Sequence, residues 1–246
     1  AATSALKPRL EKLRADHERL VSLERQAALV KQLSQPGLSE IATADILNRL
    51  RAYPVPAERT AIVLEQAKTA ALLTAEAGLI QKNLEDFFAK NSTAASIPAL
   101  PSDLTVRIQT LADEMQKFQA TSPPAGLKAP KESARAFSDI AKELPVLSTL
   151  IAKREWVEVA NLANRLEPQA ALIGSAARGT FIQLKTDATA KVDLFSKLRS
   201  EGEEAESKGD TAAAAAKFQE ALAILPDPEL QSRLARLQAP TTQPTP

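Results

Sequence analysis

The chain offers few side chains that could do chemistry, and its single histidine is the first to consider. His17 lies between Leu13 and Leu20, at three- and four-residue spacing along an apolar stripe. A protein metal site takes several ligands, and a lone histidine supplies only one. A hydrolytic triad would also have to use His17, but no serine sits in the strand–turn–helix elbow that exposes such a nucleophile. We therefore expect His17 to be packed in the fold or to contact a partner.

A second candidate for chemistry is the acidic cluster of Glu201, Glu203, Glu204 and Glu206, which could hold a cation. The Asp- and Asn-rich loop of a calcium site is missing around it, so a solvated helix face is the favoured interpretation. Glycine-rich phosphate loops are also missing from the sequence, and the lack of cysteine excludes disulfides, thiol catalysis and thiolate metal ligands. The sequence therefore predicts no enzyme activity, no metal site and no cofactor.

The clearest structural pattern is a helical hairpin at residues 192–228. Gly209 can adopt the left-handed conformation that ends a helix, and Asp210 can cap the next helix with its carboxylate. The second helix is expected at residues 211–225. Its apolar face consists of Ala214, Phe218, Ala221, Leu222 and Leu225. Pro226 ends this helix, because the residue before a proline is pushed out of the helical region.

At these residues the chain resembles a tetratricopeptide repeat. The family's small residue, Gly-Asp turn, alanine, aromatic residue, second alanine and closing proline match Gly202, Gly209, Asp210, Ala214, Phe218, Ala221 and Pro226. Leu198 and Thr211 replace the first-helix aromatic residue and the tyrosine after the turn. The resemblance implies two closely packed helices, with the aromatic ring filling the gap beside the small residues. It does not imply the family's peptide-binding groove, because an array needs about three repeats to bury a continuous core.

A second, degenerate unit of this kind is expected around Lys153 to Pro168, with Pro168 closing its second helix. Trp156, the only tryptophan, stands where the family has its tyrosine after the turn. It could be an exposed anchor for a protein partner, as aromatic residues often are. The favoured interpretation is that Trp156 plugs the hairpin that it begins. A long helical pattern at residues 169–208 then leads into the first hairpin.

The N-terminal half is predicted to consist of four helices, the first from Leu6 or Pro8 to Leu33 and the others at residues 39–52, 57–90 and 102–120. The third has two apolar sides, so we expect it to lie between neighbours. The first and fourth carry apolar residues at or close to coiled-coil spacing. In the first helix these residues are Leu6, Leu10, Leu13, His17, Leu20, Leu23, Ala27 and Val30. In the fourth they are Leu104, Ile108, Leu111, Met115 and Phe118.

Prolines and glycines indicate where the chain divides. Residues 121–131, TSPPAGLKAPK, cannot form a helix and are interpreted as a loop or an interdomain linker. We therefore predict a long-helix bundle or coiled-coil-like region at 1–120 and a helical domain similar to tetratricopeptide repeats at 132–238. Pro145 is expected to kink or break the first helix of that domain. Residues 239–246, APTTQPTP, are predicted to form a disordered tail.

The composition favours an all-α fold. Apolar residues make up 44% of the chain but aromatic residues only 4%, and sustained Val/Ile/Thr alternation, the signature of strands, is missing. A formal net charge of +1 argues against a nucleic-acid partner, which would require a basic surface. No apolar run reaches the roughly 18 residues that a membrane span requires. We therefore expect a helical protein without a membrane span.

The beginning of the chain, Ala1-Ala2-Thr3-Ser4-Ala5, lacks a methionine, as in a mature protein after removal of a signal peptide. A trimmed chain would begin in the same way. The lack of cysteine and the tail rich in proline and threonine favour a periplasmic or extracellular protein of the bacterial cell envelope, with the cytoplasm as the alternative.

Two functions remain open. The first is a non-enzymatic adaptor or scaffold that binds another protein, and its support is the repeat-like hairpin. The second is a structural subunit that self-assembles through the heptad-patterned helices. Trp156, Leu111 and Met115 are the candidate partner contacts, and polar substitutions at the last two would then abolish self-association. A membrane-surface protein is disfavoured, because the polar helix faces are mixed in sign and have no basic excess.

Overall fold

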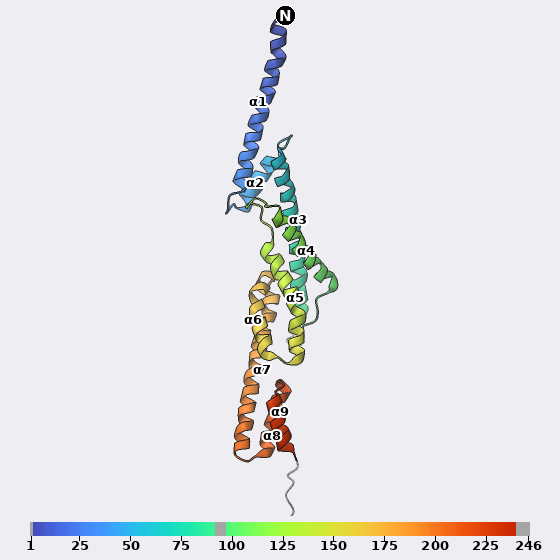
Figure 1. Cartoon of the computed structure of the whole chain (residues 1–246), viewed down its shortest axis with the longest axis vertical. Helices are drawn as coiled ribbons and strands as arrows, with labels where there is room; N and C mark the ends of the chain where they lie inside the picture. The colour runs from blue at the N-terminus through green and yellow to red at the C-terminus, as the bar shows by residue number, and fades with distance from the viewer. Residues whose placement is uncertain (1, 92–96, 240–246) are drawn as a thin grey trace, which may run out of the picture. The chain divides into compact units, whose positions relative to one another are not determined.

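A computed structural model of the chain describes residues 2–91 and 97–239 (Figure 1). Within these ranges the protein is all-α, as the sequence predicts, with nine helices and no strand. The helices are α1 (Ala2–Leu33), α2 (Glu40–Arg51), α3 (Glu58–Lys90), α4 (Ser102–Ala120), α5 (Lys131–Lys153), α6 (Trp156–Ile173), α7 (Ser175–Ser207), α8 (Thr211–Ile224) and α9 (Pro228–Gln238). The predicted tail lies outside the described residues except for Ala239.

Contacts between residues divide the chain into two compact units. Unit 1 consists of Ala1–Leu79 and Gln109–Ala134, and unit 2 of Ile80–Ile108 and Arg135–Pro246. The division falls within α3 and α4, so it differs from the sequence-based limits at residues 120 and 132. Whether the two predicted regions are independent domains stays a prediction.

The proline-rich segment at residues 121–131 is a loop that packs onto unit 1. The Gly126 amide donates a 2.8 Å hydrogen bond to the Leu33 carbonyl oxygen at the end of α1. The Leu127 side chain is buried in the same apolar cluster as Leu33. The structure shows that this segment is a loop that contributes to the core of unit 1, and its role as an interdomain linker stays a prediction.

The core of unit 1 joins α1, α2, α3 and this loop. Its buried residues are Leu29, Val30, Leu33, Ile46, Leu50, Val63, Ala67 and Leu127. Gln26 is buried beside them, and its amide group accepts a 2.7 Å hydrogen bond from the Ala57 amide and donates one to the Val55 carbonyl. These two bonds fix the connection between α2 and α3 against α1, which satisfies polar groups that would otherwise be costly to bury.

The second apolar side of α3 is exposed in unit 1. The exposed fractions of Ile62, Leu72 and Leu79 are 53%, 64% and 54%. The prediction that α3 lies between neighbours on both sides is therefore wrong for this stretch. A single face of α3, which includes Val63, Ala70, Leu73 and Ala77, supplies its buried residues there.

In unit 2, α6 packs on α7, α7 on α8 and α8 on α9. The pattern at residues 169–208 is divided at Gly174, where side chains from the end of α3 satisfy both helix termini. The Glu85 carboxylate accepts hydrogen bonds from the Ala176 and Ala177 amides at 2.8 and 3.2 Å, and the Gln81 amide donates to the last carbonyls of α6. A negative charge at a helix N-terminus also interacts favourably with the helix dipole. The break between α6 and α7 is therefore stabilised by Gln81 and Glu85 of α3, which are distant in sequence.

Two prolines lie inside helices where the sequence predicts interruptions. Helix α5 continues through Pro145, so a break there is wrong and a kink stays a prediction. Helix α6 continues past Pro168 to Ile173, so the predicted helix end at Pro168 is wrong. An internal proline removes one helical hydrogen bond and crowds the preceding turn. Buried apolar residues on both sides, such as Leu144 and Leu147 in α5, offset that cost.

Candidate protein-interaction surface

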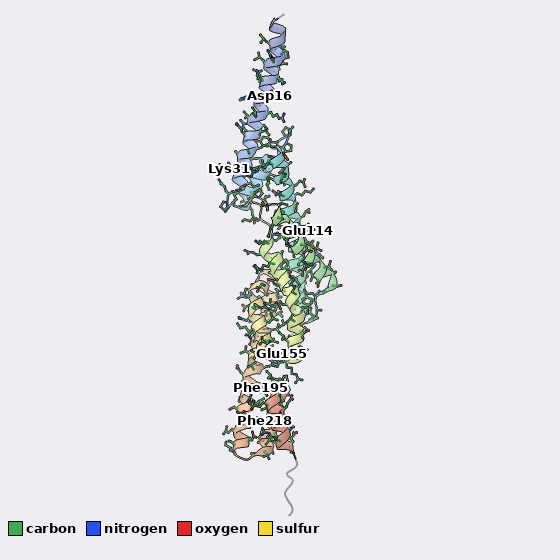
Figure 2. The ribbon with its side chains drawn as sticks, viewed as in Figure 1. Asp16, Lys31, Glu114, Glu155, Phe195 and Phe218 are labelled. Atoms are coloured by element: carbon green, nitrogen blue, oxygen red, sulfur yellow. The ribbon has the colours of Figure 1, made fainter. Side chains whose placement is uncertain are left out.

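The hairpin residues named from the sequence come together where α7 and α8 pack. Gly202 faces Phe218 so closely that a Cβ atom built on the glycine would lie 2.4 Å from the ring carbon Cε1. Ala214, Phe218 and Ala221 are completely buried. Phe195 of α7 and Phe218 of α8 are labelled in this region in Figure 2. The small residues thus allow the close approach of helices that the resemblance implies.

The turn and the end of this hairpin also follow the sequence. Gly209 has a φ of +78°, in the left-handed region, and the Asp210 carboxylate accepts a 3.0 Å hydrogen bond from the Ala213 amide. Helix α8 ends at Ile224, two residues before Pro226. Helix α9 then covers the hairpin, because Leu230 is completely buried in the cluster around Phe218. The apolar face of the hairpin is therefore used within the chain.

The acidic cluster on α7 is neutralised by basic side chains. Glu203 accepts hydrogen bonds from Arg199 at 3.1 Å and Arg233 at 2.7 Å, and Arg233 also pairs with Glu206. The hydrogen bond from Arg199 is the largest cause that holds the pKa of Glu203 below its usual 4.5, while partial burial opposes it. Glu201 and Glu204 pair with lysines. Among the described residues no acidic, histidine or cysteine group has the arrangement of a metal site.

Trp156 is an internal anchor between α6 and the end of α8. Its side chain is buried, and the indole Nε1 donates a 2.6 Å hydrogen bond to the Ile224 carbonyl. Arg154, in the turn before α6, donates to the neighbouring Ala223 carbonyl at 2.9 Å. The Lys191 ammonium lies 3.5 Å from the indole ring centroid. In this structure Trp156 thus closes the end of α8, and little of it is open to a partner.

Leu111 and Met115, the other candidate contacts, are buried on α4. Their exposed fractions are 2% and 4%, and Leu104, Ile108 and Phe118 on the same heptad stripe are equally buried. A partner could reach this stripe only if α4 left its packed position. The structure therefore places the α4 stripe in the interior, where polar substitutions would affect folding before any association.

The first part of the stripe predicted on α1 has the opposite environment, whereas Val30 at its end is buried in the core of unit 1. Leu6, Leu10, Leu13 and Leu20 are 52%, 65%, 65% and 60% exposed, and His17 is exposed among them. All residues from 6 to 20 are exposed, and this part of α1 extends away from α2 and α3 (Figure 1). Figure 2 labels Asp16 in this extension. We call Leu6, Leu10, Leu13, His17 and Leu20 the α1 stripe.

The α1 stripe does not continue the face that α1 buries in unit 1. Leu33 comes 20 residues after Leu13, which at about 100° per residue corresponds to about 200° around the helix axis. Leu29 and Val30 are buried on the Leu33 side. One helix therefore carries two apolar faces, one that anchors it in unit 1 and one that is uncovered.

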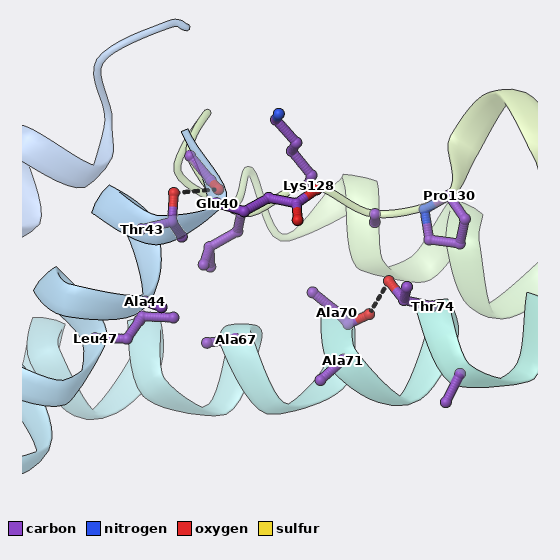
Figure 3. A pocket seen from close by; sticks show the side chains of 14 residues that line it. Glu40, Thr43, Ala44, Leu47, Ala67, Ala70, Ala71, Thr74, Lys128 and Pro130 are labelled. Carbon is purple, nitrogen blue, oxygen red and sulfur yellow. Dashed lines mark hydrogen bonds between the residues drawn. The ribbon is translucent and has the colours of Figure 1, made fainter. Parts of the chain in front are cut away.

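A groove in unit 1 is a second candidate interaction surface, and it was not predicted from the sequence. Helix α2, helix α3 and the loop before α5 enclose a volume of about 650 Å³ (Figure 3). Its lining residues are Glu40, Thr43, Ala44, Leu47, Ala67, Ala70, Ala71, Thr74, Ala75, Gly126, Leu127, Lys128, Ala129 and Pro130. The Thr43 hydroxyl donates to the Gly126 carbonyl at 3.4 Å and so joins α2 to the loop. The alanine-rich sequence of α3 was the only available signal, and alanine is equally typical of packed helices.

The groove shows no preference for a type of occupant. Its floor consists of small side chains on α3, and the two charged residues that line it, Glu40 and Lys128, have opposite signs. An apolar channel with a balanced pair of charges would accept many segments equally well. The α1 stripe, with a fixed spacing, is the more selective of the two surfaces.

No helix in residues 2–91 and 97–239 is long and apolar enough to cross a bilayer. Comparison of the chain with family models, with curated proteins and with solved structures gives no match.

Proposed function

We propose that the chain is a non-enzymatic helical protein-interaction module, an adaptor or scaffold, and that the α1 stripe is its binding surface. The observation that carries this proposal is the exposure of four leucines at heptad spacing, on a face of α1 that its own unit does not use. Exposed apolar residues are ordinary when they are scattered, but a contiguous patch is typical of an interaction site.

The packed parts of the chain support the same proposal by elimination. Trp156, Leu111 and Met115 are buried, and the hairpin face around Phe218 is covered by α9. Ion pairs occupy the acidic cluster on α7. Of the candidates from the sequence, the α1 stripe is the one that keeps an open apolar surface.

Two further parts of the proposal, the similarity to tetratricopeptide repeats and the placement in the bacterial cell envelope, come from the sequence. Similarity to tetratricopeptide repeats is supported by the close contact of Gly202 with Phe218 and by the Gly209–Asp210 turn. A single covered hairpin does not supply the groove of a repeat array. Placement in the bacterial cell envelope is supported only by the composition, which lacks cysteine.

The alternative is a structural subunit that self-assembles through heptad-patterned helices. The burial of the α4 stripe removes one of the two stripes on which that alternative depended. The α1 stripe would have to provide the whole contact between copies. That stripe spans about two heptads from Leu6 to Leu20, a length that is the same for a second copy and for a different partner helix.

The adaptor and the self-assembling subunit can be distinguished by light scattering behind size exclusion over a wide range of protein concentrations. An adaptor should keep a constant mass near 26.4 kDa. A mass that grows with concentration, and that returns to the monomer value in a variant carrying Leu10→Gln and Leu13→Gln, would overturn the adaptor and establish the self-assembling subunit. Glutamine is a good helix former, so the variant should retain α1.

A further inference from the structure

The residues that flank the α1 stripe indicate what kind of helix could cover it. When Leu6, Leu13 and Leu20 are assigned to heptad position d, and Leu10 and His17 to position a, the flanking e and g positions are fixed. Position e holds Lys7 and Arg14, and position g holds Arg9 and Asp16. Three of these four charged residues are basic, and all four are exposed.

We infer that the α1 stripe binds an amphipathic partner helix whose e and g positions are acidic, an inference that rests on the proposed function. Residues at e and g form ion pairs across a two-stranded coiled coil and set the choice of partner. Glutamate or aspartate on the partner would face Lys7, Arg9 and Arg14. Complementary charges at the edge of an apolar contact mainly give specificity and raise the rate of association.

The same positions disfavour a parallel pair of two copies of this chain. In such a pair, a g residue faces the e residue five positions further along the partner helix, so Arg9 of one copy would face Arg14 of the other. Like charges placed opposite one another disfavour an interface. In an antiparallel pair, Lys7 would face Arg14 but Arg9 would face Asp16, so repulsion and attraction offset one another, whereas an acidic partner helix would attract all three basic residues.

His17 occupies the second of the two a positions of the α1 stripe. An imidazole there is smaller than leucine and polar, and a polar residue at position a lowers stability while it restricts register. The partner helix should therefore place a small or polar residue opposite His17. The three leucines before His17 and Leu20 after it supply the apolar contact on the α1 side.

Two synthetic peptides of about three heptads test the inference. Both carry leucine at positions a and d, and they differ only in having glutamate or lysine at every e and g position. Fluorescence anisotropy of each labelled peptide, titrated with the full chain, should show saturable binding of the glutamate peptide. The lysine peptide should bind at least about tenfold more weakly, and that difference should shrink as salt is raised.

Charge-reversal variants provide the matched controls. The double variant R9E/R14E should lose its preference for the glutamate peptide and bind the lysine peptide more tightly. Lys12→Glu, at position c on the same exposed helix, changes charge away from the contact and should leave the preference in place.

Three results would overturn the inference in distinguishable ways. Equal binding of both peptides would show an apolar surface without charge selection. Failure of both peptides to bind a chain that stays monomeric would leave an adaptor that uses another surface. Growth of the chain into multimers that Leu10→Gln and Leu13→Gln abolish would show that a second copy covers the α1 stripe, and the proposed function would fail with the inference.

Discussion

The α7–α8 hairpin and the exposed part of α1 have similar apolar patterns but different environments. Phe218 and Ala214 on α8 are completely buried, whereas Leu10 and Leu13 on α1 are 65% exposed. The hairpin has Gly209 at its turn and Gly202 at its closest contact, so the chain returns and covers its own apolar face. The first break after the α1 stripe is the turn at Pro36-Gly37, and the chain that follows packs on the other end of α1. A periodic pattern predicts a helix and an apolar face, but not the molecule that covers that face.

The largest difference between the two regions is expected from truncation of their apolar side chains. Phe218→Ala should lower the free energy of unfolding by about 3–5 kcal/mol, because it removes a completely buried ring. Leu10→Ala should change it by less than about 0.5 kcal/mol, as is usual for exposed positions. Urea unfolding followed by circular dichroism measures both. Equal losses of unfolding free energy in the two variants would mean that the α1 stripe is covered in the free chain.

Substitutions at two glycines of α7 test how closely the helices of the hairpin pack. Gly202→Ala should destabilise the fold by about 1–3 kcal/mol, since its Cβ would collide with the Phe218 ring. Gly179→Ala is the matched control, because a Cβ there would meet nothing within 4 Å. In the interior of a helix that change should stabilise by up to about 1 kcal/mol. Thermal unfolding of the two variants should therefore shift in opposite directions, and shifts of the same sign would argue against close packing at Gly202.

The smallest expected effect concerns the ion pairs on the hairpin. Hydrogen bonds from Arg199 and Arg233 hold the pKa of Glu203 below 4.5, its usual value. A lowered folded-state pKa stabilises the fold above the unfolded pKa, and this contribution is lost as pH falls through the folded value. Glu203→Gln should therefore reduce the loss of stability as pH falls below 4.5. A pH profile of unfolding that is identical in both proteins would show that these pairs contribute nothing measurable.

Most helix boundaries could be predicted from local signals. The N-terminal cap at Ser39, the prolines at positions 226 and 228 and the Gly209–Asp210 turn act within a few residues, so their effect can be read from sequence. The helices continue past Pro145 and Pro168, because buried neighbours offset the cost of an internal proline. The helix break at Gly174 depends on Glu85, which is distant in sequence.

The candidate surface could be predicted only in part. Both the α1 stripe and the α4 stripe around Leu111 can be recognised in the sequence by their spacing. In the structure, however, the α1 stripe is exposed and the α4 stripe is buried. The groove of unit 1 required the loop at Gly126 to fold back onto Leu33, a contact between residues far apart in the chain. Burial against distant segments is a tertiary property, which a local periodicity does not contain.

In the free chain the α1 stripe is exposed, whereas the α4 stripe is buried. Because the chain has no cysteine, single substitutions Leu13→Cys and Met115→Cys each introduce one thiol that a maleimide reagent can report. We expect the thiol at position 13 to react as fast as a free thiol at every protein concentration, and the thiol at position 115 to be strongly protected. Protection at position 13 that increases with protein concentration would instead show that copies of the chain cover the α1 stripe.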